Sequence, residues 1–159
     1  GGKVGQIVQT VKTTETSQAG STGTFYDVSG MTVAITPTKA SSKILVQLGA
    51  QVEPRYAFIV KVQRDIDGAG YADIFIGTDP RASQIQTATY GFGGWMDQIT
   101  SGYSYLDSPS YDLTDVITYK MQWHEVNSGV CHLNSSYDDS DTSDYWRGAS
   151  SFTVWEILA

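Results

Sequence analysis

The stretch I-T-Y-K-M-Q-W-H, residues 117–124, decides the fold class because apolar and polar residues alternate along it with a period of two. Successive side chains of a β-strand point to opposite faces, so this pattern predicts a strand with one buried face. The predicted buried face carries Ile117, Tyr119, Met121 and Trp123. The same alternation occurs in residues 31–35, 44–52 and 58–62.

Turn-forming sequences separate these stretches, among them V-S-G (28–30), D-I-D-G-A-G (65–70) and N-S-G (127–129). Residue usage favours Thr, Ser, Val, Ile, Tyr and Gly, which suit strands and turns better than helices. We expect about ten short strands and no helix, a pattern typical of an antiparallel β-sandwich or jelly roll. A single domain should span residues 1–159, with residues 1–14 as an N-terminal strand that continues from an upstream stalk or a partner.

The N-S-G sequence predicts a hairpin in which Gly129 takes the left-handed position. This hairpin would pair His124 with His132 on one face, where two imidazoles could hold Zn²⁺ if a third ligand joined them. It would place Cys131 on the other face as a small core residue. Asp67 and Gly68 are predicted to form another turn, rather than the start of a calcium loop.

Charge and cysteine content exclude several classes of protein. The formal net charge is −7, which disfavours nucleic acid or an anionic membrane as the partner. The only cysteine is Cys131, so no intramolecular disulfide can form. No apolar run approaches the ~18 residues of a membrane span. The chain starts with Gly-Gly-Lys, which suggests a processed protein or a C-terminal piece of a longer one.

Three stretches resemble a family of phage virion domains that occur in tail-fibre and other appendage proteins of marine and cyanobacterial phages. They are G-Q-I-V-Q-T-V-K-T-T-E-T (5–16), F-Y-D-V-S-G-M-T-V-A-I-T-P-T-K-A-S-S-K-I-L-V (25–46) and S-S-F-T-V-W-E-I-L (150–158). The resemblance covers both ends and the first third of the chain but not residues 65–115. It implies a jelly roll assembled as a homotrimer, similar to the heads of C1q-like and tumour-necrosis-factor-like proteins. It also implies exposure on the virion surface, contact with other virion proteins and a role in host attachment.

The last strand is apolar on both faces, which suggests that one face is buried against another copy of the chain. The residues predicted at this oligomer interface are Phe152, Val154, Trp155 and Ile157. A central position in a monomeric sandwich would explain the same pattern.

The sequence S-S-Y-D-D-S-D-T-S-D-Y-W-R-G (135–148) places four aspartates among aromatic residues. Asp138, Asp139, Asp141 and Asp144 are weak candidates for Ca²⁺, because no closing bidentate Glu follows them. Aromatic residues beside an arginine favour binding instead, since these residue types carry contact energy at interfaces and can stack on sugar rings. The ligand-binding candidates are Tyr137, Tyr145, Trp146, Arg147, Tyr90, Phe92 and Trp95. The segment 103–111 is a further candidate for host contact.

No catalytic site is predicted. Glu53, Glu125 and Glu156 lie in or beside strands with nothing to pair two of them, and no nucleophile motif is present. The sequence therefore favours a non-enzymatic virion protein that binds a host glycan or protein. Two alternatives remain: a capsid decoration or connector protein without a host ligand, and a stand-alone carbohydrate-binding module.

Overall fold

A computed structural model describes residues 2–21, 23–78, 85–92, 99–126 and 129–158. These residues form eleven strands and no α-helix, so the all-β prediction is confirmed. No helix in the described ranges is long and apolar enough to cross a membrane. The strands are β1 (Lys3–Lys12), β2 (Thr16–Ala19), β3 (Tyr26–Ile35), β4 (Lys43–Pro54), β5 (Ala57–Ile66), β6 (Ala72–Ile74), β7 (Thr89–Phe92), β8 (Ile99–Asp107), β9 (Ile117–Glu125), β10 (Val130–Leu133) and β11 (Ser150–Leu158).

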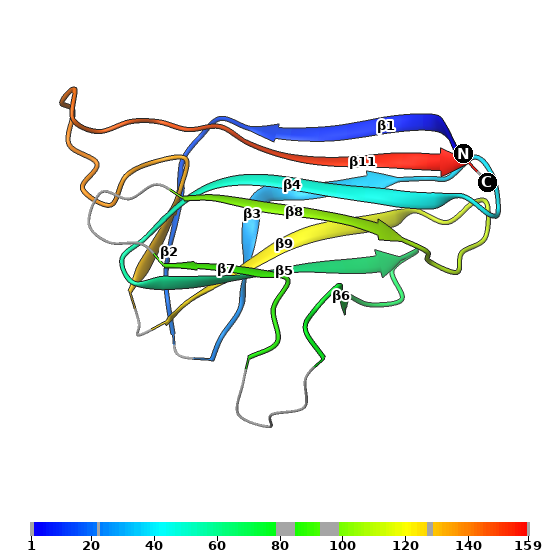
Figure 1. Cartoon of the computed structure of the whole chain (residues 1–159), viewed down its shortest axis with the longest axis horizontal. Helices are drawn as coiled ribbons and strands as arrows, with labels where there is room; N and C mark the ends of the chain where they lie inside the picture. Colours follow the sequence, from blue (N-terminus) through cyan, green and yellow to red (C-terminus); the bar gives the residue numbers. More distant parts are fainter. Residues whose placement is uncertain (1, 22, 79–84, 93–98, 127–128, 159) are drawn as a thin grey trace.

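The strands form two antiparallel sheets that pack face to face as a jelly roll (Figure 1). Sheet A has the order β1-β11-β4-β10-β2, and β8 pairs with β4 as well. Because β8 pairs along residues 44–52 while β11 and β10 pair with residues 43–49 and 52–54, β8 occupies the opposite edge of β4. Sheet B has the order β3-β9-β5-β6, and β7 also pairs with β5.

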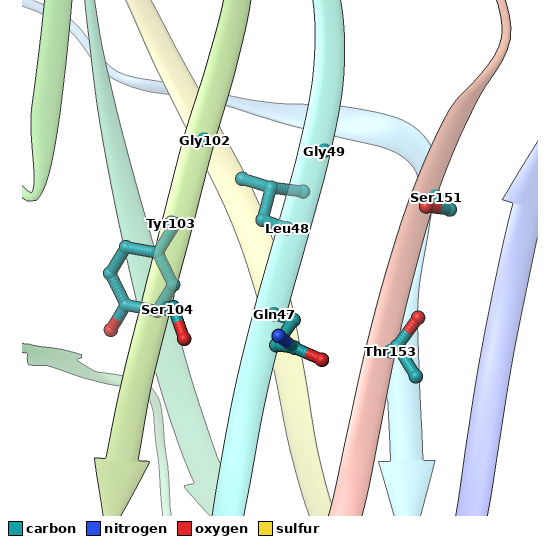
Figure 2. Close-up of a pocket in the computed structure, with 8 residues that line it drawn as sticks. All are labelled: Gln47, Leu48, Gly49, Gly102, Tyr103, Ser104, Ser151 and Thr153. Carbon is teal, nitrogen blue, oxygen red and sulfur yellow. The ribbon is translucent and has the colours of Figure 1, made fainter.

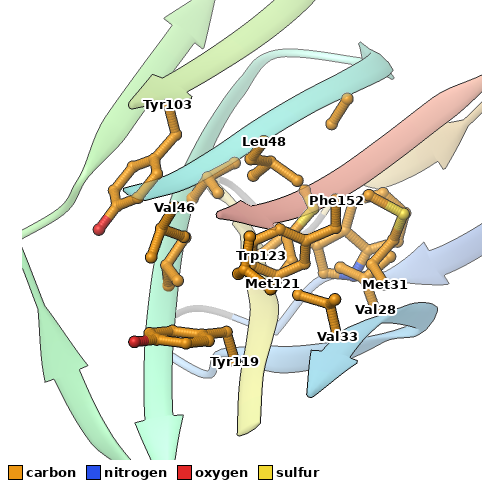
Figure 3. Packing of buried hydrophobic residues seen from close by; sticks show 14 of the residues in the cluster. Val28, Met31, Val33, Val46, Leu48, Tyr103, Tyr119, Met121, Trp123 and Phe152 are labelled. Carbon is orange, nitrogen blue, oxygen red and sulfur yellow. The ribbon is translucent and has the colours of Figure 1, made fainter. Parts of the chain in front are cut away.

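The alternation read from the sequence matches the buried faces of the strands. Met121 and Trp123 of β9 meet Phe152 of β11 and Leu48 of β4 between the two sheets (Figure 3). All four side chains are almost completely buried. Burying large apolar side chains is the main source of stability of such a sandwich. The core therefore uses one face of each sheet.

The predicted hairpin around the N-S-G sequence is wrong. β9 pairs with β3 and β5 in sheet B, whereas β10 pairs with β2 and β4 in sheet A, so the connection crosses from one sheet to the other. His124 and His132 consequently do not face each other on one sheet. Cys131 is buried in the core as predicted, because odd-numbered residues face inward in β10 as they do in β9.

The predicted turn at Asp67 and Gly68 is confirmed. Both residues have positive φ, 50° and 79°, and the turn connects β5 to β6. The Asp65 carboxylate accepts hydrogen bonds from the backbone N–H groups of Gly68 and Gly70. Its oxygens thus stabilise the turn from within.

The two ends of the sandwich differ in what they carry. Lys3 of β1 pairs with Leu158 of β11, so both ends of the chain lie together at one end of the sandwich. The segment 134–149, which connects β10 to β11, lies at the opposite end (Figure 1). This segment contains the aspartates and aromatics singled out from the sequence.

Candidate functional site

Asn134 shapes the Asp-rich loop, which we define as residues 134–149, by holding both of its ends. It adopts a left-handed conformation (φ 62°) directly after β10, and asparagine tolerates this region better than most residues. Its amide nitrogen Nδ2 donates hydrogen bonds to the carbonyls of Lys12 and Thr14. Its Oδ1 accepts one from Ser150, where β11 begins, at 2.6 Å. The sequence pattern did not identify this fully buried residue; an asparagine at a strand end was the only available signal.

Tyr137 fastens the loop to the outer face of sheet A. Its backbone N–H donates to Glu53 Oε1 at 2.9 Å, and its ring packs edge-on against His132. The Arg55 guanidinium lies 5.5 Å from the centre of the same ring and donates to the Tyr137 hydroxyl at 3.3 Å. Tyr137 is half-buried, so it mainly anchors the loop.

Beneath Tyr137 lies a group of polar side chains that are only partly hydrogen-bonded. Glu53 Oε2 and His132 Nδ1 are both buried and have no hydrogen-bond partner among the described residues, although the two residues are opposite each other on β4 and β10. Burial lowers the pKa of His132, while the negative charges of Glu53, Glu15 and Asp139 oppose this effect. His132 is therefore mainly neutral at pH 7.

The outer part of the loop encloses a small hollow of about 220 Å³. Trp146 is 48% exposed and lines this hollow beside Arg147, which forms an ion pair with Asp139 at 2.6 Å. The Tyr145 hydroxyl donates to Asp138 Oδ2 at 3.0 Å, and this hydrogen bond raises the pKa of Tyr145. An aromatic face surrounded by hydrogen-bonding groups is a suitable arrangement for contact with a sugar or with a polar protein surface.

The four aspartates do not converge on a metal site. Asp138 accepts hydrogen bonds from Ser140 and Tyr145, and Asp139 is paired with Arg147. Within the part of the chain that the structure describes, no three Asp, Glu, His or Cys side chains come together as metal ligands. The zinc hypothesis for the two histidines fails as well, because His124 is buried in sheet B with its Nδ1 3.1 Å from the Thr24 carbonyl oxygen.

The remaining aromatic candidates are divided between the core and the edge of sheet B. Tyr90 and Phe92 belong to β7, which pairs with β5, and Trp95 lies outside the described residues. In the segment 103–111, Tyr103 is buried in the core, and the Tyr111 hydroxyl donates to the carbonyls of Lys39 and Ser42. Contrary to the expectation of host contact, Tyr103 and Tyr111 serve packing within the chain.

The predicted oligomer interface needs a correction. Phe152 and Val154 are fully buried between the two sheets, so their side chains cannot contact another copy. Trp155 and Ile157 point the other way, to the outer face of sheet A, and both are half-buried. A strand that is apolar on both sides does not reveal from its sequence which side faces the core.

On the same outer face, a shallow hollow of about 570 Å³ lies over β4, β8 and β11 (Figure 2). Gly49, Gly102 and Ser151 leave this part of the face without bulky side chains, and Gln47, Ser104 and Thr153 border it. The sequence pattern did not indicate this hollow, because these residues come from three strands far apart in the chain.

The buried glutamates each accept hydrogen bonds from neighbouring backbone or side-chain groups. Glu125 accepts hydrogen bonds from the Tyr56 N–H and the Cys131 thiol, and burial raises its pKa. Glu156 accepts hydrogen bonds from the connection between β3 and β4. These contacts give Glu125 and Glu156 structural roles.

No protein-family model matches this chain, and no curated protein matches its sequence. Among solved structures, the chain is similar to the VP2 subviral particle of infectious bursal disease virus, with 9% sequence identity and a TM-score of 0.43. That match covers 97% of this chain and 38% of the VP2 chain. A structure of the Gx strain of the same virus matches at 12% identity and a TM-score of 0.39, covering 97% of this chain and 37% of the other. This chain thus spans less than two fifths of the structures it matches.

Proposed function

We propose that this chain is a non-enzymatic structural protein of a virus particle, exposed on the virion surface as the head of a fibre or another appendage. In this role it attaches the particle to a glycan or protein of the host surface. The observation that carries the proposal is the position of the Asp-rich loop. It presents Trp146 and Arg147 at the end of the sandwich opposite the two chain ends. An attachment head needs its contact residues away from the end by which it is mounted.

The contact residues are of the kind that binds at interfaces. Exposed tryptophan and arginine contribute much of the binding energy at protein interfaces, and a tryptophan face also stacks on sugars. Asp139 holds Arg147 at 2.6 Å, and Tyr145 is held by Asp138, so both side chains are pre-positioned. Pre-positioned side chains lose less conformational entropy on binding than mobile ones.

Assembly as a homotrimer would multiply a weak contact. Three linked sites raise the effective concentration of one another, which often increases avidity by ~10²–10⁴. The apolar outer face of sheet A, which includes Trp155 and Ile157, supports self-association.

One observation favours the second candidate, a capsid decoration or connector protein without a host ligand. An attachment head should concentrate exposed aromatics at its distal end, whereas a connector should place them along the face that meets its neighbour. This chain has Trp146 at the loop end and Trp155 on the outer face of sheet A. The two functions are compatible in one protein, but only the first requires Trp146. A stand-alone carbohydrate-binding module would use Trp146 without assembly.

Glycan-array binding of Trp146→Ala tests the proposal, with Tyr71→Ala as the matched control. Tyr71 is 44% exposed but lies beside β6, outside the loop. We expect the natural chain and the Tyr71 variant to bind the same glycans, and the Trp146 variant to bind at least roughly tenfold more weakly. Failure of the natural chain to bind either the array or intact host cells would leave the connector role.

Light scattering with and without EDTA then addresses assembly and metal together. A trimer unaffected by EDTA would support the appendage head with a metal-free loop. Dissociation in EDTA would instead indicate that a structural cation holds the copies together. A monomer would instead favour the isolated binding module.

A further inference from the structure

A continuous apolar row crosses the outer face of sheet A. In the strand register Ile7 is opposite Trp155, Trp155 is opposite Leu45, and Leu45 is opposite Leu106. Ile7 and Leu106 are 52% and 45% exposed, and the two residues between them are half-buried. We call these four residues the apolar row. Contiguous exposed apolar side chains of this kind mark an interaction surface rather than a solvated one.

The charge of this face is unlike that of the whole chain. The protein contains 17 Asp and Glu residues and has a net charge of −7. The outward positions of β4, β8 and β11 between residues 43–49, 102–106 and 151–157 are all described and carry no carboxylate; Lys43 is their one charged residue. Two copies of an acidic chain repel each other wherever carboxylates face carboxylates. The acid-free part of the face formed by these positions is the surface on which this repulsion is weakest.

The hollow beside the apolar row contains two glycines that the chain itself does not require. Gly49 and Gly102 are opposite each other on β4 and β8, and neither has a positive φ. Among the described residues, a Cβ at Gly102 would meet no atom within 4 Å, and one at Gly49 would meet only Ser151 Oγ at 3.8 Å. By contrast, a Cβ at Gly91 would collide with the Phe58 ring. Glycine inside a strand weakens the strand and often marks the close approach of another backbone.

These three features lead to one inference, which deepens the self-assembly part of the proposed function and rests on it. We infer that the outer face of sheet A docks a second copy of this chain, with the apolar row buried in the contact and the Gly49–Gly102 pair admitting the neighbouring copy. A second copy is the occupant that the charge pattern favours, because the acid-free face removes the repulsion that two chains of the same negative charge would otherwise meet. The row and the hollow lie side by side on one face, so the surface combines a protruding part with a recess that can receive it.

Filling the recess tests the inference. Gly102→Leu places a side chain above β8, where its Cβ meets no described atom within 4 Å, and Leu106→Lys places a charge in the apolar row. Gly77→Leu is the matched control, because a Cβ there also meets nothing within 4 Å and its φ is not positive. Light scattering over a concentration series measures association, and thermal unfolding followed by circular dichroism verifies that each variant is folded.

We expect the natural chain and Gly77→Leu to associate, and Gly102→Leu and Leu106→Lys to remain folded with at least tenfold weaker association. A monomeric natural chain would overturn the inference, as would association that both face variants leave unchanged. Glycan binding by the Trp146 hollow is measured separately on each folded variant. If the face variants lose association but still bind glycan as single copies, the docking face is separate from the proposed attachment site. If association is intact and no variant binds glycan, only the attachment function is contradicted.

Discussion

The two outer faces of the sandwich follow the same alternation of residues but differ in charge. On sheet B, Lys61 pairs with Asp73 at 2.8 Å and Lys120 pairs with Asp27 at 2.9 Å. On sheet A, the outward positions between residues 43–49, 102–106 and 151–157 are uncharged except for Lys43. Solvated faces tolerate interlocked charges, whereas the centres of interfaces are depleted of them. The comparison teaches that alternation defines two faces per strand, and that only the outward residues distinguish a solvated face from a docking face.

The paired charges of sheet B also have a measurable electrostatic signature. Burial raises the pKa of Asp73. Hydrogen bonds from Lys61 and Gln63 and the charge of Lys61 lower it by a larger amount, so the pKa lies below its ordinary value. Burial and the same kinds of contact, from Gln122 and Lys120, act on Asp27 with the same net result. These carboxylates stay ionised at neutral pH and keep the outer face of sheet B charged.

The largest effect on stability should come from replacing an inward side chain of β11, and an outward side chain of the same strand provides the comparison. Phe152→Ala removes a fully buried ring and should lower the free energy of unfolding by about 3–5 kcal/mol. Trp155→Ala, on the opposite side, should affect association more than unfolding. Urea denaturation and light scattering on both variants measure the two quantities. If Phe152→Ala separated copies without reducing stability, the assignment of the two sides would be wrong.

The next effect concerns Glu156, an inward residue of the same strand. Its carboxylate is fully buried and accepts hydrogen bonds from Ser42 Oγ and the Thr38 N–H. Burial raises its pKa, but these hydrogen bonds and one from Gln6 lower it more, so the pKa falls below the ordinary 4.5. Glu156→Gln should therefore lower the free energy of unfolding by about 2 kcal/mol at pH 7, as expected for hydrogen bonds to a charged group.

The pH dependence of that difference follows from the direction of the shift. Because the folded-state pKa is depressed, the stabilisation is complete above pH 4.5 and is lost as the pH falls through the lower, folded-state pKa. Urea unfolding at several pH values should show the natural chain and the variant converging in acid. If the difference in unfolding free energy between the natural chain and the variant stayed constant down to the lowest pH, an ionised Glu156 would be contradicted.

A smaller effect should follow when a carboxylate is placed on each face. Gln47→Glu adds a negative charge to the outer face of sheet A and should weaken self-association roughly tenfold, about 1.4 kcal/mol. Thr32→Glu adds the same charge to sheet B, where Lys120 is opposite in the register, and should leave association unchanged. Sedimentation equilibrium measures both. Equal effects of the two substitutions would remove the distinction between the faces.

The smallest effect belongs to the ion pairs of sheet B. A double-mutant cycle on Lys61 and Asp73 should give a coupling energy of about 0.5 kcal/mol, because partly exposed pairs are screened by water. The coupling should shrink further in high salt. Thermal unfolding of the two single variants and the double variant provides the measurement. A coupling of several kcal/mol would mean that this face is not solvated.

The sequence predicted the fold better than the site. Strands at residues 31–35, 44–52, 58–62 and 117–124 were predicted because one buried face produces strict alternation. The pairing of β9 with β10 was wrong because alternation does not specify the neighbouring strand, and these two consecutive strands belong to different sheets. The role of Asn134 was missed, since its partners lie on β1 and β11, far away in the sequence.

The ligand-binding role of the candidate residues stays a prediction, and the structure adds where they lie. Trp146 and Arg147 line an exposed hollow, consistent with an expectation based on residue type alone. The anchoring of Tyr137 on His132 and Arg55 could not be predicted, because β10 and β4 bring these residues together only in the folded chain.

By itself, the sequence determined the all-β class, the inward faces of most strands and the loop that carries Trp146. These properties depend on neighbouring residues, since the period of a strand and the chemistry of a turn are local. Only the tertiary structure decided that Phe152 faces the core while Trp155 faces outward, and that Gly49 and Gly102 meet across two strands. Such choices depend on which sheet covers which face, and that is set by packing between segments distant in the chain.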